Sequence, residues 1–168
     1  DDTKGWLVVN DGNNDAGSQA EFVAATGGNT VATVCTNFKV HTFTGPGTFC
    51  VSSAGNAAGS NTVSYMVIGG GAGAGTNAGG GGGAGGFREG RTPTCSYTVS
   101  PLNAPAGLPV SVQGYSIVVG GGGAGSPSVN AAGGSGNASS FSTISSAGGG
   151  GGGTGTSPQA GVAGASGG

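Results

Sequence analysis

Glycine is the feature that most restricts what this chain can fold into. It provides 43 of the 168 residues, whereas its usual share is roughly 7%. Much of it stands in uninterrupted runs, at residues 69–71, 79–83, 120–123 and 148–153. Fixing the backbone of glycine costs more conformational entropy than fixing that of any other residue. Glycine runs that are ordered therefore need packing neighbours on several sides.

The rest of the composition favours order. A glycine content this high without a three-residue period is typical of disordered, low-complexity chains. Disorder, however, usually also requires high net charge and little apolar material. Here charged residues make up 6% of the chain, the formal net charge is −2 and hydrophobic residues reach 35%. The alternatives are long flexible connections and packed glycine, and we favour packed glycine.

Packed glycine segments have a suitable backbone conformation available. In the left-handed threefold helix that collagen uses, the backbone makes no internal hydrogen bonds, and glycine at the axis allows close approach. The N–H and C=O groups can then bond to neighbours on several sides. Because a small monomer offers few neighbours, we expect other copies of the chain to supply them.

The apolar residues are grouped in short, β-branched runs that predict strands. Residues 38–44 alternate with period two, and the turn signal Gly45-Pro46-Gly47 predicts residues 48–51 as their hairpin partner. No window has an amphipathic helical repeat. We expect further strands at residues 30–35, 62–68, 96–99, 110–112, 115–119 and 140–144. The predicted fold class is all-β, with sandwich or jelly-roll-like strands and ordered, polyglycine-like segments.

Two of the predicted strands end in a glycine run in the same way. Residues 65–68 lead into residues 69–71, and about fifty residues later residues 117–119 lead into residues 120–123. This shared register indicates a weak internal repeat, which suits a stacked or fibrous architecture.

The N-terminal section differs from the rest, and we divide the chain into an N-terminal segment, 1–29, and a glycine-rich β domain, 30–168. The N-terminal segment contains one short apolar strand, which is formed by Trp6, Leu7, Val8 and Val9. This strand, or the residues from Glu21 to Thr26, is expected to add to the open sheet edge of the next subunit.

A short acidic stretch in the N-terminal segment resembles the start of a calcium-binding loop. Asp11, Asn13 and Asp15 alternate as in an EF-hand, but Ala16 stands where the loop requires glycine and Phe22 where it requires glutamate. We expect a solvated turn, and no metal ion.

The three cysteines are Cys35, Cys50 and Cys95. One disulfide and one leftover thiol is the simplest pairing in an oxidising compartment, and Cys35 and Cys50 are candidates for facing each other across neighbouring strands. The alternative is three small buried thiols. The spacing does not decide the connectivity.

The sequence lacks the residue combinations that catalysis requires. The one histidine, His41, lies in the middle of a predicted strand, where a strand-surface role is favoured over catalysis, and no acidic pair accompanies it. A G-x-G-x-x-A match begins at Gly69, but glycine follows where a phosphate-binding helix would have to start. We therefore expect no enzyme activity, no catalytic residue and no cofactor.

Charge and hydropathy restrict the partners. The four basic residues are too few and too scattered for a nucleic-acid interface, and no stretch approaches the ~20 apolar residues of a membrane span. Arg88 and Glu89 lie in the single charge cluster after the N-terminal segment, which is either a subunit contact or a solvated turn. Asn137 begins an Asn-Ala-Ser sequon, a possible glycosylation site.

Several segments, in their order along the chain, resemble the glycine-rich domain of bacteriophage tail-fibre and related bacterial surface proteins. The resemblance covers about residues 38–168, and the cysteines depart from it. It implies a structural or adhesive role and no catalytic residues. The segments that carry it are residues 41–51, 65–71, 79–90, 97–99, 137–144 and the final glycine run.

These observations lead to two function hypotheses of different classes. The first is a non-enzymatic structural subunit that polymerises with copies of itself into an extracellular or virion fibre. The second is a phage tail-fibre adhesin, in which glycine-rich loops bind a host or cell-surface receptor and Phe87 is the candidate aromatic contact. A filament is open-ended, whereas a tail fibre is a closed oligomer.

Overall fold

The computed structural model describes residues 19–91, 100, 103–155 and 159–165, and these contain strands but no helix. The all-β fold class is therefore confirmed. The strands are β1 (Val23–Thr26), β2 (Thr30–Val34), β3 (Phe38–Thr42), β4 (Gly47–Ala54), β5 (Thr62–Val63), β6 (Tyr65–Ile68), β7 (Phe87–Gly90), β8 (Leu108–Pro109), β9 (Gly114–Val118), β10 (Ser139–Phe141) and β11 (Ile144–Ser146).

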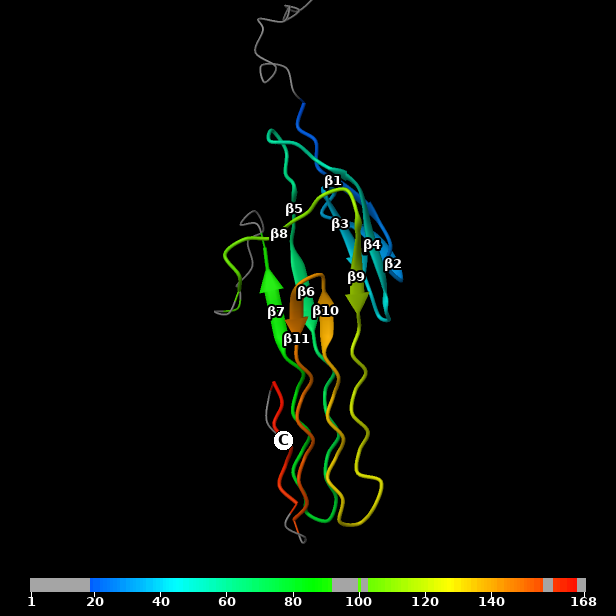
Figure 1. Cartoon of the computed structure of the whole chain (residues 1–168), viewed down its shortest axis with the longest axis vertical. Coiled ribbons are helices and arrows are strands. Elements are labelled where there is room, and N and C mark those ends of the chain that lie inside the picture. Colours follow the sequence, from blue (N-terminus) through cyan, green and yellow to red (C-terminus); the bar gives the residue numbers. More distant parts are fainter. Residues whose placement is uncertain (1–18, 92–99, 101–102, 156–158, 166–168) are drawn as a thin grey trace, which may run out of the picture.

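The strands form open sheets in a sandwich-like arrangement. The main sheet is antiparallel with the order β1-β4-β9-β10-β11, and the pairs β2–β3, β5–β8 and β6–β7 form three smaller sheets. The β6–β7 pair packs against the main sheet, because β6 contacts β10 and β11 and β7 contacts β11. Figure 1 shows the sheets in the upper part of an elongated molecule, with the glycine-rich segments below them.

The core between the sheets is built around Phe141. Its ring makes edge-to-face contacts with Phe49, Tyr115 and Tyr65, at centroid distances of 5.9, 6.1 and 6.4 Å. Phe49, Tyr115 and Phe141 come from neighbouring strands of the main sheet, while Tyr65 comes from β6. Such aromatic pairs stabilise a core beyond the area they bury, so this cluster holds the two sheets together.

Tyr115 also has a polar role at the edge of the core. Its hydroxyl group accepts hydrogen bonds from the backbone N–H of Ser111 (2.8 Å) and from Nε2 of Gln113 (2.9 Å). Hydrogen bonds with Ser111 and Gln113 lower the pKa of the Tyr115 phenol because they favour its anionic form. The loop before β9 is thereby attached to the core.

The glycine-rich residues form six extended segments that lie side by side. We number them in chain order: segment 1 (69–75), segment 2 (79–86), segment 3 (120–126), segment 4 (131–137), segment 5 (147–153) and segment 6 (159–165). Segments 1, 3 and 5 continue from β6, β9 and β11, and segments 2 and 4 lead back into β7 and β10. Figure 1 shows these segments running down from the sheets and returning.

The pairing of the strands continues into the segments without a change of register. In the β6–β7 pair Ile68 faces Phe87, and in the next step the N–H of Gly69 donates to the carbonyl of Gly86 (2.9 Å). Similarly, β9 and β10 pair directly above segments 3 and 4, and β10 and β11 above segments 4 and 5. The bundle of glycine segments is therefore a continuation of the sheets.

Hydrogen bonding within the bundle repeats every three residues. Along segment 5, all seven carbonyl groups from Ala147 to Gly153 accept a backbone N–H, and the donors belong in rotation to segments 2, 6 and 4. A period of three without bonds inside the segment is the property of the threefold extended helix. The expectation of packed, threefold glycine is thus correct, and the flexible-connection alternative is wrong.

Glycine is required in segment 5 because the neighbouring backbones lie so close. A β-carbon on any glycine from 148 to 152 would overlap a carbonyl oxygen of a neighbouring segment. The oxygen belongs to segment 4 for Gly148 and Gly151, to segment 2 for Gly149 and Gly152, and to segment 6 for Gly150. Even alanine would therefore force the segments apart. This geometry explains why the longest glycine run of the sequence stands at the centre of the bundle.

One expectation about the glycine runs is wrong. We expected other copies of the chain to supply the neighbours that ordered glycine needs. In the structure, segment 5 bonds to segments 1, 2, 4 and 6 of its own chain. The chain leaves the sheets three times, after β6, β9 and β11, and thereby provides six segments for one bundle. Ordered glycine by itself therefore does not require association with other copies of the chain.

Several strand predictions need correction. Residues 48–51 belong to β4, which pairs with β1 and β9, while the hairpin partner of β3 is β2. Residues 62–68 are divided into β5 and β6, and residues 140–144 turn at Ser142, which has φ of 54°. Residues 110–112 are not a strand, β7 was not predicted, and residues 96–99 lie outside the described residues.

The first strand changes the proposed division of the chain. β1, which we assigned to the N-terminal segment, pairs with β4 of its own chain from Val23 to Thr26. Residues 19–29 therefore contribute to the β domain, and the expectation that Glu21 to Thr26 add to another subunit is wrong. The expected segment from Trp6 to Val9 lies outside the described residues.

We predict opposite effects for two glycine-to-alanine substitutions in the bundle. Gly149→Ala should lower the free energy of unfolding by roughly 2–3 kcal/mol, because overpacking displaces the segment. Gly81→Ala should leave stability unchanged or raise it by ~0.5 kcal/mol, since nothing lies within 4 Å of its β-carbon and alanine restricts the unfolded chain. Thermal and urea unfolding measure both, and equal effects would contradict the close packing of segment 5.

The aromatic cluster gives a second prediction. Phe141→Ala should cost about 3–5 kcal/mol of stability, as expected for removing a buried aromatic side chain. Phe22 is 66% exposed, and Phe22→Ala serves as the matched control with an expected change within about 0.5 kcal/mol. Chemical denaturation followed by circular dichroism tests the pair. A small loss for Phe141→Ala would show that the sheets are held together elsewhere.

Candidate subunit interface

The β2–β3 hairpin extends from the main sheet and is exposed along most of its length. Its strands pair from Thr30 opposite Thr42 to Val34 opposite Phe38. Every residue of β2 is exposed, and in β3 only His41 is partly buried. Figure 1 shows the hairpin beside β4, at the opposite end of the molecule from the tip of the bundle.

The inner face of the hairpin is attached to the domain through His41. Its ring packs edge-to-face on Phe49 with centroids 5.2 Å apart, and Nδ1 donates a hydrogen bond to the carbonyl of Gly27 (2.7 Å). These contacts give the histidine a structural role. Because side chains alternate across a strand, Lys39, Thr33 and Val31 lie on this same face.

The opposite face of the hairpin is apolar and points away from Phe49. We call this surface, formed by Ala32, Val34, Phe38 and Val40, the outer face. Val34, Val40 and Phe38 are 45%, 43% and 42% exposed, and the outer face contains no charged residue. In an ordinary two-faced sheet the apolar face would be buried and the polar face solvated. Here neither face is buried: on the inner face Val31 is 50% exposed and only His41 is partly buried, and the apolar outer face is exposed as well.

The alternation of the sequence in β2 and β3 contains a signal for the outer face. Even-numbered residues in both strands are apolar or threonine, whereas three of the four odd positions hold Thr33, Lys39 and His41, and the fourth holds Val31. The alternation predicts strands, but its period does not say which face meets the domain. That orientation depends on the contact between His41 and Phe49.

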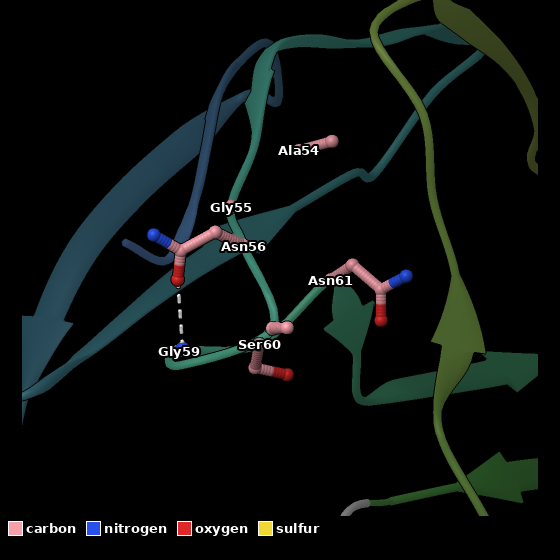
Figure 2. Close-up of a pocket in the computed structure, with 7 residues that line it drawn as sticks. Ala54, Gly55, Asn56, Gly59, Ser60 and Asn61 are labelled. Carbon is pink, nitrogen blue, oxygen red and sulfur yellow. Dashed lines mark hydrogen bonds between the residues drawn. The ribbon is translucent and has the colours of Figure 1, made fainter. Parts of the chain in front are cut away.

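A shallow hollow lies where the described chain begins. It is lined by Ala54, Gly55, Asn56, Ala57, Gly59, Ser60 and Asn61, and Figure 2 shows the bond from the Gly59 N–H to Oδ1 of Asn56 (2.9 Å). Asn56 also accepts from the N–H of Glu21 (3.1 Å) and donates to the carbonyl of Gln19 (2.7 Å). The amide of Asn56 therefore fixes the start of the described chain.

The predicted contact residues Arg88 and Glu89 have different positions. Both belong to β7, so the charge cluster is not a turn. Arg88 is exposed, whereas Glu89 is only 8% exposed and its Oε1 has no hydrogen-bond donor among the described residues. Arg88 is available for a contact with another molecule, and Glu89 is not.

Phe87 does not lie at a loop tip, where the adhesin hypothesis needed it. It is the first residue of β7, opposite Ile68. The tip of the bundle, where segments 1 and 3 end, instead presents polar side chains. Asn77 Nδ2 donates a hydrogen bond to Asn130 Oδ1 (3.0 Å), and Thr76 Oγ1 donates one to the carbonyl of Ser128 (2.7 Å).

The cysteines lie apart from one another in the fold. Cys35 follows β2 at the hairpin turn, with φ of 49°, and Cys50 lies in β4 of the main sheet. Both thiols are free and exposed, so the disulfide suggested for Cys35 and Cys50 is not formed, and neither thiol is buried. Cys95 lies outside the described residues.

The sequon lies where segment 4 joins β10. Asn137 is exposed, but its N–H donates to Gly121 (2.9 Å) and its carbonyl accepts from Gly70 (2.9 Å). The sequon serine, Ser139, is 4% exposed, and its Oγ accepts the N–H of Gly120 (2.9 Å). The backbone of the sequon is therefore part of the bundle, with the side chain of Asn137 at the surface.

The described residues contain neither a metal-binding cluster nor a membrane-spanning helix. No group of three or more His, Cys, Asp or Glu side chains is placed to hold a metal ion within this part of the chain. Among the same residues, no helix has the length and hydrophobicity that crossing a bilayer requires.

Comparison with known proteins identifies one family. A family model described as a glycine-rich domain matches residues 44–168. No curated protein and no solved structure matches significantly. The match includes β4 to β11 and all six glycine segments, whereas β1 and the β2–β3 hairpin lie before it.

The exposed thiols give a test of this part of the fold. In a Cys95→Ser variant, Cys35 and Cys50 should both react with a chromogenic thiol reagent under native conditions, because both side chains are exposed and reactivity requires access. The denatured protein provides the total thiol count. An unreactive native protein whose mass is lower by two hydrogens would instead establish a disulfide.

Proposed function

Because the chain belongs to the glycine-rich domain family over residues 44–168, we propose that it is a non-enzymatic structural subunit that polymerises into an extracellular or virion fibre. The bundle and strands β4 to β11 correspond to the family domain, whereas β1, which completes the main sheet, lies before it. The residues before it add the β2–β3 hairpin and the N-terminal segment, and we assign polymerisation to this addition.

The outer face of the hairpin is the observation that carries the proposal. A two-stranded hairpin is marginally stable in water, and a contiguous exposed apolar patch on a domain is a candidate interaction site. Val34, Phe38 and Val40 are each about two-fifths exposed on such a hairpin. Covering this face with a second copy removes apolar area from water, at about 25 cal/mol per Å².

The low charge of the chain supports self-association. Only 6% of the residues are charged and the net charge is −2. Repulsion between copies is therefore small, and a net charge near zero promotes association. The rod-like family domain would then serve as a rigid unit of the fibre, since its glycine segments are bonded along their whole length.

The second candidate is a phage tail-fibre adhesin, and the polar tip of the bundle favours it. Thr76, Asn77, Ser126 and Asn130 lie at this end, far from the sheets. Loops carried by a rigid scaffold are common recognition sites. In this case the chain would form a closed oligomer, and the tip of the bundle rather than the hairpin would bind the receptor.

Electron microscopy and sedimentation of the purified chain over a range of concentrations test the proposal. We expect open-ended filaments above a critical concentration. Val40→Lys should raise that concentration at least about tenfold, because a lysine in an apolar contact costs more than the 1.4 kcal/mol that a factor of ten represents. Circular dichroism should show that the variant remains folded, since the side chain points to solvent.

Val129→Lys is the matched control, because Val129 is 70% exposed and lies at the tip of the bundle. It should leave the critical concentration unchanged. A chain that stays monomeric, or forms closed trimers insensitive to Val40→Lys, would overturn the fibre proposal. If Val129→Lys instead abolished binding to cells while Val40→Lys did not, the adhesin would be the better account.

A further inference from the structure

The outer face has a complement in the sequence of the same chain. We propose that the strand from Trp6 to Val9 of one copy packs on the outer face of the β2–β3 hairpin of the next copy. The inference rests on the proposed function and deepens it, because it names both partners of the contact between subunits.

The first argument is that no described part of the chain covers the outer face. Ala32, Val34, Phe38 and Val40 are all exposed, and the contacts of the hairpin with the domain come from His41 on the other side. The structure thus leaves a neutral apolar strip that is one hairpin long. An occupant must be apolar and of similar length.

The second argument is the length and composition of the chain that precedes Gln19. These 18 residues contain one apolar run, Trp6-Leu7-Val8-Val9, between polar residues on both sides. In an extended strand, successive side chains point to opposite faces, so in the proposed contact Trp6 and Val8 would share one side and Leu7 and Val9 the other. Either side matches an apolar strip, and a tryptophan is a frequent anchor of protein interfaces.

The third argument is charge. The first 18 residues contain four aspartates, Asp1, Asp2, Asp11 and Asp15, and one lysine, Lys4. The hairpin from Thr30 to Thr42 contains Lys39 and no acidic residue. Lys39 lies on the inner face, so the outer face itself carries no charge. The uncharged run from Trp6 to Val9 can therefore pack on the outer face without burying a charged side chain.

Each copy carries both the strand from Trp6 to Val9 and an outer face that can accept the strand of another copy. The backbone of Gln19 and Glu21 is fixed by Asn56, so the preceding residues leave from a defined point of the domain. A chain that offers one strand and accepts another forms a head-to-tail contact, and repetition of such a contact gives an open filament.

Energy transfer between copies tests the inference directly, because Trp6 is the single tryptophan of the chain. The donor copy retains Trp6 and carries Cys35→Ser, Cys50→Ser and Cys95→Ser. The acceptor copy carries Trp6→Phe, Cys50→Ser and Cys95→Ser and is labelled at Cys35 with a dye that accepts tryptophan fluorescence. Cys35 follows Val34 directly and is exposed, so the dye reports on the outer face.

On mixing the two copies, we expect quenched Trp6 emission, sensitised dye emission and a shift of Trp6 emission to shorter wavelength, all rising with concentration. Val40→Lys in the acceptor copy should raise the protein concentration needed for half-maximal transfer at least about tenfold. As a control, a dye at Val129→Cys in an acceptor copy without other cysteines should show much weaker transfer. Removing residues 1–18 from all copies should abolish filaments without unfolding the domain, since β1 remains.

The outcomes separate the inference from the function on which it rests. Filaments without transfer to Cys35, or filaments that persist without residues 1–18, overturn the inference and leave the fibre intact. Blue-shifted Trp6 emission that is independent of concentration shows that the strand folds back onto its own hairpin and also overturns it. The absence of both filaments and transfer overturns the inference and the function together.

Discussion

The structure depends on direct contact between the backbones of the glycine segments. Each carbonyl from Ala147 to Gly153 accepts one bond, and the donors rotate among three neighbouring segments. A hydrogen bond contributes only about 1 kcal/mol net, but a buried carbonyl without a donor would cost more than that, so the bundle must be nearly complete to be stable. Glycine allows this because a β-carbon on any residue from Gly148 to Gly152 would displace a neighbour.

The sheets and the bundle stabilise each other. The aromatic cluster around Phe141 holds β6 and the main sheet together through side chains, and it thereby fixes the register in which segments 1 to 5 enter the bundle. Ordinary sheets pack about 10 Å apart because side chains lie between them. Where the side chains end, after Ile68, Val119 and Ala147, the same pairs continue in the same register, but the layers approach and bond directly.

Because the glycine bundle is complete within one chain, its glycine residues do not indicate how copies of the chain associate. The bundle finds its neighbours within one chain, so its order says nothing about partners. The outer face of the β2–β3 hairpin is an apolar surface that no described residue covers, and it precedes the part of the chain that matches the family model. Its apolar residues are turned outward because His41 attaches the opposite face to Phe49 and to Gly27. The proposed assembly therefore depends on an orientation, and not on composition.

The sequence by itself determined the all-β class, the existence of β2, β3 and β9, and the packing of glycine in threefold extended segments, because period-two alternation and long glycine runs are local properties. Only the tertiary structure decided which strands are neighbours. β3 pairs with β2 instead of β4, and β1 belongs to the sheet of its own chain, because pairing depends on contacts between distant residues. The same holds for the candidate interface: alternation placed Val34 and Val40 on one face, but the contact between His41 and Phe49 decided that this face points to solvent.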